Sequence, residues 1–596
     1  MSERDYGPQS NPLDFNEAAV SSTDQSFYDD VKNRFKHERD IRLGYRPPGS
    51  KMYQDFSGDL ANYEADPYSS APEAREPIEE SVEVLFIGGG FSALLTSARL
   101  KEKGVDSIRI IERGADFGGS WYWNRYPGVA CDIIAYDYLP LLDETGYVPS
   151  RRYARGDEIF AYCKLIGERY DLYRHAAFQT TVNSTVWNEE SGVWDVKTDR
   201  GDHIKAKFVV CANGSLAKPK VAMIDGILDF AGHSFHTSRW DYDYTGKDLE
   251  NLADKKVAII GTGASAVQVV GEISKKVGQL YVFQRTPSAI FDRDDWETDP
   301  EWAASLEPGW QASRRQKAFS DIRRTQDEKA KFANETREEK LRRLENANID
   351  TMMTVHSQIE NIVKDPETAE ALKPWYMLLC KRPCIHNEYL PSFNLPNVRL
   401  VDTKGKGVTN ITEAGPEFEG EIFDVDLIIY ATGFEVQKTG IYNRIVGKAD
   451  LQLEDKHKDG YRTVLGIHSH GFPNFFVMGG LQAFFSFNLT DVLNCQGEHI
   501  AECIDFMRKT GRDVMDVTAS TEEWWVQKVI ENRGKTDRNK ECTPGYFNME
   551  GAENRRQDGP YNGSMLEYLD YMAQVRGEMD RNFEFLAKAE GEARAL

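Results

Sequence analysis

The sequence lacks the features of secreted, membrane-spanning and nucleic-acid-binding proteins. Its first residues, MSERDYGPQSNPLDF, contain no basic segment followed by an apolar one, so we expect no secretory signal. No run reaches the ~20 apolar residues that a membrane-spanning helix needs. The formal net charge is −23, and an acidic surface repels nucleic acid and anionic membranes. We therefore expect a cytoplasmic protein with no nucleic-acid or membrane partner.

Cysteine is scarce and is not arranged for metal binding. The eight cysteines are scattered, and none forms a CxxC pair. The closest two, Cys380 and Cys384, have no second pair that would complete a zinc site. We expect reduced thiols, as in cytosolic proteins, and no metal.

The N-terminal residues 1–79 are polar and rich in turn formers, although residues 26–43 have the pattern of an amphipathic helix. One interpretation is a disordered tail. The other, which we favour, is an arm that lies on the body, because Tyr45, Tyr53, Phe56 and Tyr63 give it side chains to bury.

A first nucleotide-binding pattern follows this arm. The apolar run VEVLFIGGG leads into the helical pattern SALLTSARLKEKG, which predicts a strand, a tight glycine turn and a helix. Gly88 permits the sharp turn, Gly90 lets the backbone approach a pyrophosphate, and Ala93 lets the helix pack close to the sheet. Phe91 is counted with them among the predicted cofactor-binding residues. Glu112 ends the next strand, at the spacing of an acid that accepts hydrogen bonds from ribose hydroxyls. A carboxylate there repels a 2′-phosphate, so this site should hold FAD or NAD rather than NADP.

A second pattern of the same kind is KKVAIIGTGASAVQVVGEISKKV. Its predicted cofactor-binding residues are Gly261, Gly263, Ala264 and Ser265. Here the next strand ends in Gln284-Arg285-Thr286, without an acid. A guanidinium and a hydroxyl suit a 2′-phosphate, so we expect NADPH at this turn.

These patterns predict an α/β fold with two Rossmann-like dinucleotide-binding domains, one for FAD and one for NADP. Residues 294–373 are highly charged and predict a helical insertion in the NADP domain. The expected divisions are residues 1–79 for an N-terminal extension that wraps the body, 80–217 for the first part of the FAD domain, 218–396 for the NADP domain, and 397–596 for the second part of the FAD domain with a C-terminal segment on the substrate side.

The two sites imply electron transfer from NADPH to FAD. A disulfide reductase would carry a redox CxxC motif, which this chain lacks, so O₂ is the favoured final acceptor.

The segment FAGHSFHTSRWD at residues 230–241 lies between the expected domains. It resembles the FxGxxxHxxxW fingerprint of the Baeyer–Villiger monooxygenases, a family within the flavin monooxygenases, and the resemblance runs from about residue 82 to about residue 497. The matching residues are Phe230, Gly232, His236, Trp240 and Asp241. Related enzymes that oxygenate nitrogen or sulfur usually have Tyr or Phe in place of Trp240. The family role of this motif is mostly structural, so we do not assign His236 as a base.

Other segments are similar to the same family. FGGSWYWNRYPG at residues 117–128 resembles its flavin-wrapping stretch, and ATGF at 431–434 resembles the turn that returns the chain to FAD. The resemblance implies that the cofactor-binding residues include Gly119, Trp121, Trp123, Tyr126, Asp132, Ala431, Thr432 and Gly433. It also implies that Lys381 joins Arg285 and Thr286 at the 2′-phosphate, and that Arg382 is the catalytic arginine.

The chemistry accounts for an arginine at that position. Reduced flavin and O₂ give a C4a-peroxide, which must attack a ketone before a proton or water destroys it. A guanidinium stays protonated, so Arg382 is expected to keep the peroxide anionic and to stabilise the alkoxide that forms on the carbonyl oxygen. Asp132 would orient the arginine. The expected reaction is the NADPH- and O₂-dependent conversion of a ketone to an ester or lactone.

The long N-terminal extension and the segment 381–388 resemble the subgroup that accepts bulky or large-ring ketones, whereas residues 543–551 depart from the usual family loop. Phe484, Phe485 and Phe487 are candidates either for an apolar pocket or for ordinary core packing. Two other functions stay open: oxygenation of sulfur or nitrogen by the same peroxide, and a flavin reductase or redox sensor that transfers no oxygen. The oligomeric state is not determined by the sequence, and our working expectation is a monomer.

Overall fold

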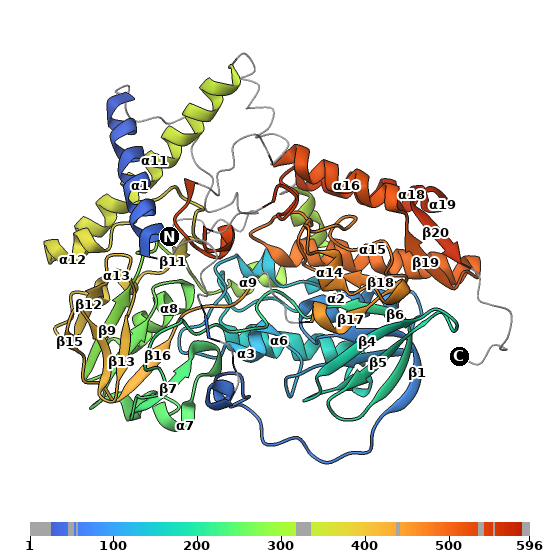
Figure 1. Ribbon diagram of the computed structural model, residues 1–596, viewed down its shortest axis with the longest axis horizontal. Coiled ribbons are helices and arrows are strands. Elements are labelled where there is room, and N and C mark those ends of the chain that lie inside the picture. Colours follow the sequence, from blue (N-terminus) through green and yellow to red (C-terminus); the bar gives the residue numbers. More distant parts are fainter. Residues whose placement is uncertain are drawn as a thin grey trace.

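The computed structural model describes residues 25–45, 53–54, 56, 58–317, 335–436, 441–533, 541–551 and 555–586. Two sheet-centred bodies lie side by side (Figure 1). Helices α1 (Gln25–Tyr45) and α11 (Arg337–Ile362) project from one, and helices α16 (Ala519–Asn532) and α18 (Met565–Gly577) cover the other. This arrangement confirms the predicted α/β class with two dinucleotide-binding units. No helix in the described part of the chain has the length and apolar character needed to cross a membrane.

The first sheet is centred on β1 (Glu79–Ile87), which pairs in parallel with β2 (Ile108–Ile111) and β6 (His203–Cys211). Val84, Leu85 and Phe86 are fully buried, as expected for a central strand covered on both faces. The strand order is β17-β4-β5-β6-β1-β2-β3, with β18 also paired to β6. The outer strands are β3 (Ala176–Ala177), β4 (Val182–Asn188), β5 (Val193–Thr198), β17 (Ile445–Val446) and β18 (Phe475–Val477).

Helices α2 (Phe91–Glu102) and α15 (Leu489–Thr510) pack together beside this sheet. A Cβ atom at Gly497 would lie 2.9 Å from the Thr96 hydroxyl, so only glycine permits this close approach. The C-terminal helices α16 (Ala519–Asn532) and α18 (Met565–Gly577) add Trp525 and Tyr568 to the same core. Strands β19 (Val514–Val517) and β20 (Phe583–Leu586) pair antiparallel at its edge.

The second sheet is entirely parallel, in the order β12-β9-β8-β16-β7. Its strands are β7 (His233–His236), β8 (Lys256–Ile260), β9 (Gln279–Gln284), β12 (Val398–Asp402) and β16 (Leu427–Tyr430), and helix α8 (Ala264–Ile273) follows β8. We expected residues from 397 onward to rejoin the FAD domain, and that boundary is wrong. Strands β12 and β16 pair with β9, β8 and β7. Strand partners far apart in sequence leave no local signal that shows which sheet a strand joins. The other proposed domain divisions stay predictions.

The described residues of the N-terminal extension up to Tyr63 lie on the second unit, whereas Asp66 and Arg75 contact the first. Helix α1 (Gln25–Tyr45) confirms the helix predicted at 26–43 and lies beside α11 (Arg337–Ile362) in Figure 1. Its buried Tyr28 and Phe35 share a core with Ile349 and Met352 of α11. The 3₁₀ helix Gly58–Tyr63 then buries Leu60 and Tyr63 against the second sheet. The described part of the extension is therefore a packed arm, whereas residues 1–24 and 46–52 lie outside the described residues.

The described part of the expected insertion at 294–373 is mainly helical. It contains α9 (Pro300–Ala304), α11 and α12 (Pro366–Ala371), and residues 318–334 lie outside the described part. Thr336 and Glu339 cap the start of α11 reciprocally, as a capping box does.

Apart from the 14-residue helix α6 (Gly156–Arg169), the remaining helices and strands are short. They are α3 (Ser120–Trp123), α4 (Ala135–Tyr138), α5 (Leu142–Thr145), α6 (Gly156–Arg169), α7 (Tyr242–Thr245), α13 (Tyr389–Ser392), α14 (Leu453–Lys456), α19 (Met579–Asn582), β10 (Ile290–Phe291), β11 (Cys384–Ile385), β13 (Asn410–Thr412), β14 (Gly415–Phe418) and β15 (Glu421–Ile422).

Candidate active site

The first glycine turn joins β1 to α2 as predicted. Gly88 has φ +107°, and a Cβ there would come within 2.7 Å of the Ala212 carbonyl oxygen, so the turn requires glycine. Gly90 is the N-cap of α2, and no side chain caps this end. The first N–H groups of α2 are therefore available to an anion such as a pyrophosphate.

Glu112 is buried directly beside this turn. Its carboxylate accepts hydrogen bonds from the N–H groups of Gly89, at 2.5 Å, and Gly114, at 2.6 Å. Burial raises the pKa of Glu112, while these two backbone hydrogen bonds oppose the increase. A carboxylate has further lone pairs beyond these two bonds, so Glu112 is able to accept from ribose hydroxyls as well.

The segment 117–128 folds over the first turn. The Gly118 N–H donates to the Gly89 carbonyl at 3.1 Å. A Cβ on Gly119 would lie 2.9 Å from the Gly90 Cα, so the two backbones meet without side chains between them. Trp121 and Trp123 come from the short helix α3 that follows. The glycines therefore form a backbone cradle that fits the phosphates of FAD.

The second turn differs in its openness. Gly261 has φ +117°, and its Cβ would lie 2.4 Å from the Ala431 carbonyl oxygen, which places the ATGF segment against the turn. Gly263 is the N-cap of α8 without a side-chain cap, and a Cβ there would have no heavy atom within 4 Å. Ala264 and Ser265 begin α8 at this exposed end. The site fits a dinucleotide that enters from solvent.

Arg285 and Thr286 follow β9 at the same edge of the sheet. The Thr262 hydroxyl donates to the Thr286 carbonyl at 2.8 Å, which connects the glycine turn to this segment. Lys381 donates from Nζ to the Pro544 carbonyl at 2.8 Å, on the C-terminal loop. The assignment of all three residues to a 2′-phosphate stays a prediction.

Arg382 and Asp132 form an ion pair between the two units. The guanidinium donates from Nε at 3.0 Å and from Nη2 at 2.6 Å to the two carboxylate oxygens, a bidentate geometry. The charge of Asp132 raises the pKa of Arg382 further above its ordinary value, although burial opposes the increase. Arg382 is therefore a permanent cation, and Asp132 fixes its orientation.

Further contacts join the units around this pair. The Tyr126 hydroxyl donates to Gln268 Oε1 of α8 at 3.0 Å, and Gln268 donates back to the Ala130 carbonyl at 3.0 Å. Arg293 donates to the Cys131 carbonyl at 3.1 Å. The flavin-wrapping segment is thus bound by hydrogen bonds to the helix that begins at the second turn.

The fingerprint residues occupy structural positions. His236 is fully buried at the end of β7, and Ser238 donates its N–H to Nδ1 at 3.1 Å. Burial lowers the pKa of His236 to about 3, so the ring is neutral near pH 7. A Cβ on Gly232 would lie 2.8 Å from the Asp426 carbonyl oxygen and would strike the ring of Phe230.

Trp240 and Asp241, the last two fingerprint residues, stabilise the turn after β7 by hydrogen bonds. Trp240 Nε1 donates to the Thr245 hydroxyl at 3.0 Å, and the Trp240 N–H donates to the Tyr68 hydroxyl at 3.0 Å. Asp241 caps α7 by accepting from the Tyr244 N–H. The residues of the ATGF turn lie nearby, because the ring centroids of His236 and Phe434 are 5.6 Å apart and the Gly433 carbonyl accepts from the Lys220 N–H at 2.9 Å.

A disulfide that the sequence analysis missed lies next to the arginine. Cys380 and Cys542 are bonded, although 162 positions separate them. The expectation of reduced thiols is therefore wrong for this pair, because nothing local in the sequence shows that the two residues meet. The bond ties the Lys381-Arg382 segment to the loop that carries Tyr546. Burial raises the pKa of Tyr546, and the charge of Arg382 acts in the opposite direction.

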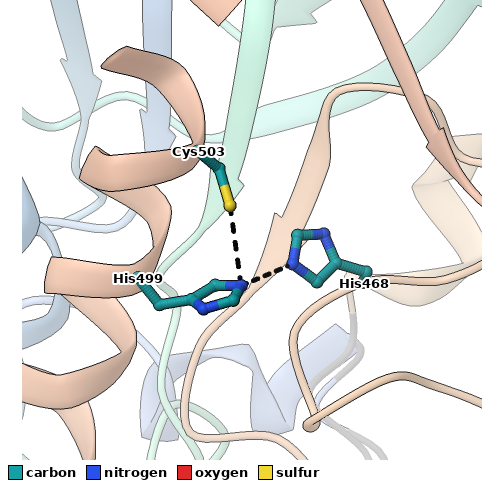
Figure 2. Close-up of side chains that lie close together, drawn as sticks. All are labelled: His468, His499 and Cys503. Atoms are coloured by element: carbon teal, nitrogen blue, oxygen red, sulfur yellow. Dashed lines mark hydrogen bonds between the residues drawn. The ribbon is translucent and has the colours of Figure 1, made fainter. Parts of the chain in front are cut away.

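His468, His499 and Cys503 are grouped closely enough to suggest a metal site, and Figure 2 shows His499 between the other two. His468 Nε2 lies 2.9 Å from His499 Nε2, and Cys503 Sγ lies 3.6 Å from the same atom. Arg576 donates to His499 Nδ1 at 2.9 Å. A guanidinium only donates, so His499 carries its proton on Nε2, where a metal would have to bind. The cluster is therefore a hydrogen-bonded structural network.

The comparisons with known proteins agree with this geometry. Residues 81–306 match a family model described as flavin-binding monooxygenase-like. Neopentalenolactone D synthase of Streptomyces avermitilis is 40% identical over 581 residues, which cover 92% of this chain and 97% of that protein. A Baeyer–Villiger monooxygenase of Stachybotrys chlorohalonatus is 39% identical over 568 residues, covering 90% of each chain.

Solved structures have the same fold. The polycyclic ketone monooxygenase of the thermophilic fungus Thermothelomyces thermophila matches with a TM-score of 0.85 and 30% identity, over 95% of this chain and all (100%) of that one. OTEMO, solved in complex with FAD and NADP, matches with a TM-score of 0.73 and 26% identity, over 85% of this chain and 99% of its own. The chain belongs to the flavin-binding monooxygenases and, within them, to the Baeyer–Villiger monooxygenases.

Proposed function

We propose that this enzyme converts a bulky, apolar ketone to an ester or lactone with FAD, NADPH and O₂. The single observation that carries the proposal is the Arg382–Asp132 ion pair, which places a fixed cation between the FAD and NADP units. When bound, FAD reduced by NADPH supplies the activated oxygen that attacks the carbonyl. The residues of this chain provide binding, orientation and electrostatics.

The two turns divide the binding of the cofactors. The cradle of Gly88, Gly90 and Gly119, with Glu112 at the ribose, would hold FAD. Gly261 and Gly263, with Arg285 and Thr286, would hold NADPH, and Lys381 is proposed as a further cation at its 2′-phosphate. Ala431, Thr432 and Gly433 would lie beside the NADPH turn, since Ala431 abuts Gly261 and the Gly433 carbonyl accepts from the Lys220 N–H.

Arg382 would act on charge rather than on protons. A guanidinium whose pKa is raised by Asp132 does not give up its proton near neutral pH, so it stabilises negative charge that develops on the carbonyl oxygen without protonating it. Its bidentate bond to Asp132 holds it in place before the substrate arrives, so little reorganisation is needed during the reaction.

The size of the substrate is inferred from aromatic residues beside the arginine. The charge of Arg382 acts to lower the pKa of Tyr546, which shows that the two side chains are close. The ring centroid of Tyr546 lies 4.3 Å from that of Phe547. Phe547 in turn contacts Phe485, which contacts Phe487. Phe485 is 39% exposed, although a core phenylalanine would be covered. A row of aromatic rings that begins beside the arginine and includes the exposed Phe485 fits an apolar ketone with several rings.

The test is a product analysis under ¹⁸O₂. The holoenzyme is supplied with NADPH and, in separate reactions, a polycyclic ketone, cyclohexanone, a thioether and a tertiary amine. We expect an ester or lactone with one labelled oxygen, formed faster from the polycyclic ketone than from cyclohexanone. Labelled sulfoxide or N-oxide without any labelled ester would show that heteroatom oxygenation is the activity. Hydrogen peroxide as the sole oxygen product would show a reductase.

A further inference from the structure

Helix α1 of the N-terminal extension places an arginine at the end of β9 where the coenzyme 2′-phosphate is expected. Arg42 Nε donates to the Thr286 hydroxyl at 2.9 Å, and Nη2 lies 3.4 Å from the Arg285 carbonyl. Arg42 is only 8% exposed, so it is a fixed part of this edge of the sheet rather than a surface cation.

The bond from Arg42 determines what the Thr286 hydroxyl is able to do. A hydroxyl has one hydrogen to donate and lone pairs that accept. One lone pair of Thr286 already accepts from Arg42, and among the described residues the hydroxyl donates to no other group. Its hydrogen is thus available to an acceptor, and a phosphate offers only acceptors at neutral pH. The neighbouring Thr286 carbonyl is held by Thr262, so the residue is fixed on both sides.

The orientation of Arg42 is itself set within α1. Glu38, one helical turn earlier, accepts from Nη1 at 2.7 Å through its carboxylate and at 2.8 Å through its carbonyl. These bonds aim Nε at Thr286 and leave Nη2 on the side of Arg285. Residues 38, 42, 285 and 286 therefore form one hydrogen-bonded unit that crosses from the extension to the coenzyme site.

We propose that Arg42 is a positioning residue for NADPH: it orients Thr286 and the Arg285 backbone toward the 2′-phosphate, so that α1 contributes to the choice of NADPH over NADH. The inference rests on the proposed function, which assigns the second turn to NADPH. A purely structural Arg42, which only anchors α1, would affect coenzymes with and without the 2′-phosphate equally.

The experiment measures equilibrium binding to the FAD-loaded enzyme by calorimetry, with 2′,5′-ADP and 5′-AMP as probes, because these ligands differ in the 2′-phosphate and require no turnover. Arg42→Ala should lower the affinity for 2′,5′-ADP by about tenfold or more, which is the scale of a hydrogen bond to a charged group. The affinity for 5′-AMP should not change. Arg42→Lys retains the charge but loses the Nε donor, so its affinity should fall between those of wild type and Arg42→Ala.

A matched control is Lys32→Ala, which breaks the ion pair between α1 and Glu345 of α11 far from the coenzyme. It should bind both probes like the wild type. Thr286→Ala tests the route of the effect: if Arg42 acts through Thr286, adding Arg42→Ala to Thr286→Ala should produce a smaller loss than Arg42→Ala alone.

The outcomes separate this inference from the proposed function. A wild-type enzyme that binds 2′,5′-ADP no better than 5′-AMP would show that the second turn does not select NADPH. If the wild type preferred 2′,5′-ADP over 5′-AMP and Arg42→Ala kept the same preference, only the role of Arg42 would be overturned. If Arg42→Ala lowered the affinity for both probes equally, or if Lys32→Ala lowered the affinity for 2′,5′-ADP as much as Arg42→Ala does, Arg42 would only anchor α1.

Discussion

The two glycine turns of this enzyme begin alike and end differently. Both open with a glycine at positive φ, Gly88 at +107° and Gly261 at +117°, pressed against the carbonyl of a following strand segment. Both helices start at a glycine N-cap without a side-chain cap. The shared backbone provides the same anion site in each unit.

The surroundings give each site a separate role. Gly90 is covered by Gly119, whereas the corresponding Gly263 faces open space. The first turn has a buried carboxylate beside it, and the second has Arg285 and Thr286. An enclosed site favours slow release, as a prosthetic FAD requires, and an open site favours exchange, as a coenzyme requires. The same fold is thus adapted to FAD at one turn and to NADPH at the other by a few side chains and by the loop that carries Gly119.

The largest effect is expected where the two units meet. Arg382→Ala should lower ester formation by about 10³-fold, the scale of removing an electrostatic donor to a developing oxyanion. Reduction of the flavin by NADPH should continue, since neither turn is changed. Stopped-flow absorbance measures reduction, and chromatography measures the ester. Ester formation at the wild-type rate would contradict the role of Arg382.

The enclosed turn is tested by Glu112→Ala. The variant leaves the N–H groups of Gly89 and Gly114 buried without their acceptor, at a cost of ~1–3 kcal/mol each. We expect the affinity for FAD to fall by about 10²-fold. The flavin-to-protein absorbance ratio after gel filtration measures it, with Glu102→Ala, an exposed carboxylate at the end of α2, as the control. Full retention of FAD would remove Glu112 from the binding site.

A buried histidine in each half should make stability depend on pH. Burial lowers the pKa of His236, beside the second sheet, and of His468, beside the first, to about 3. Below pH 6.5 the two histidines take up protons in the unfolded chain but stay neutral in the folded chain. The free energy of unfolding is therefore greatest above pH 6.5 and decreases as the pH falls below it. Each histidine should cost about 2 kcal/mol between pH 7.5 and pH 5.

Urea unfolding at a series of pH values measures this loss, and His468→Gln should reduce the slope between pH 6.5 and pH 5. An unchanged slope in that variant would show that His468 does not contribute. If the two halves unfold separately, the same series would show which half loses stability first.

The smallest effect is expected at the open turn. Arg285→Ala should raise the KM for NADPH by about tenfold and leave the KM for NADH unchanged, because only NADPH carries the 2′-phosphate. Steady-state kinetics with both coenzymes measures the ratio. An equal increase for both would show that Arg285 does not select the phosphate.

Local sequence patterns predicted the parts of the structure that depend on local geometry. Gly88 and Gly261 lie in the turns that their spacing indicated, and helix α1 matches its apolar periodicity. The pairing of Arg382 with Asp132, 250 positions apart, was implied only by the family resemblance. The membership of β12 in the second sheet, the Cys380–Cys542 bond and the Arg42–Thr286 contact were not foreseen, because each depends on tertiary packing that leaves no periodic signal.

The bond between Cys380 and Cys542 has a practical consequence for anyone who handles this enzyme. Cleavage of this bond by a thiol reductant would give a second covalent form of the polypeptide, in which the segment bearing Arg382 is no longer tied to the loop bearing Tyr546. Rates measured with and without a reductant are therefore comparable only when the state of this bond is known, and the additive belongs in the record of every assay.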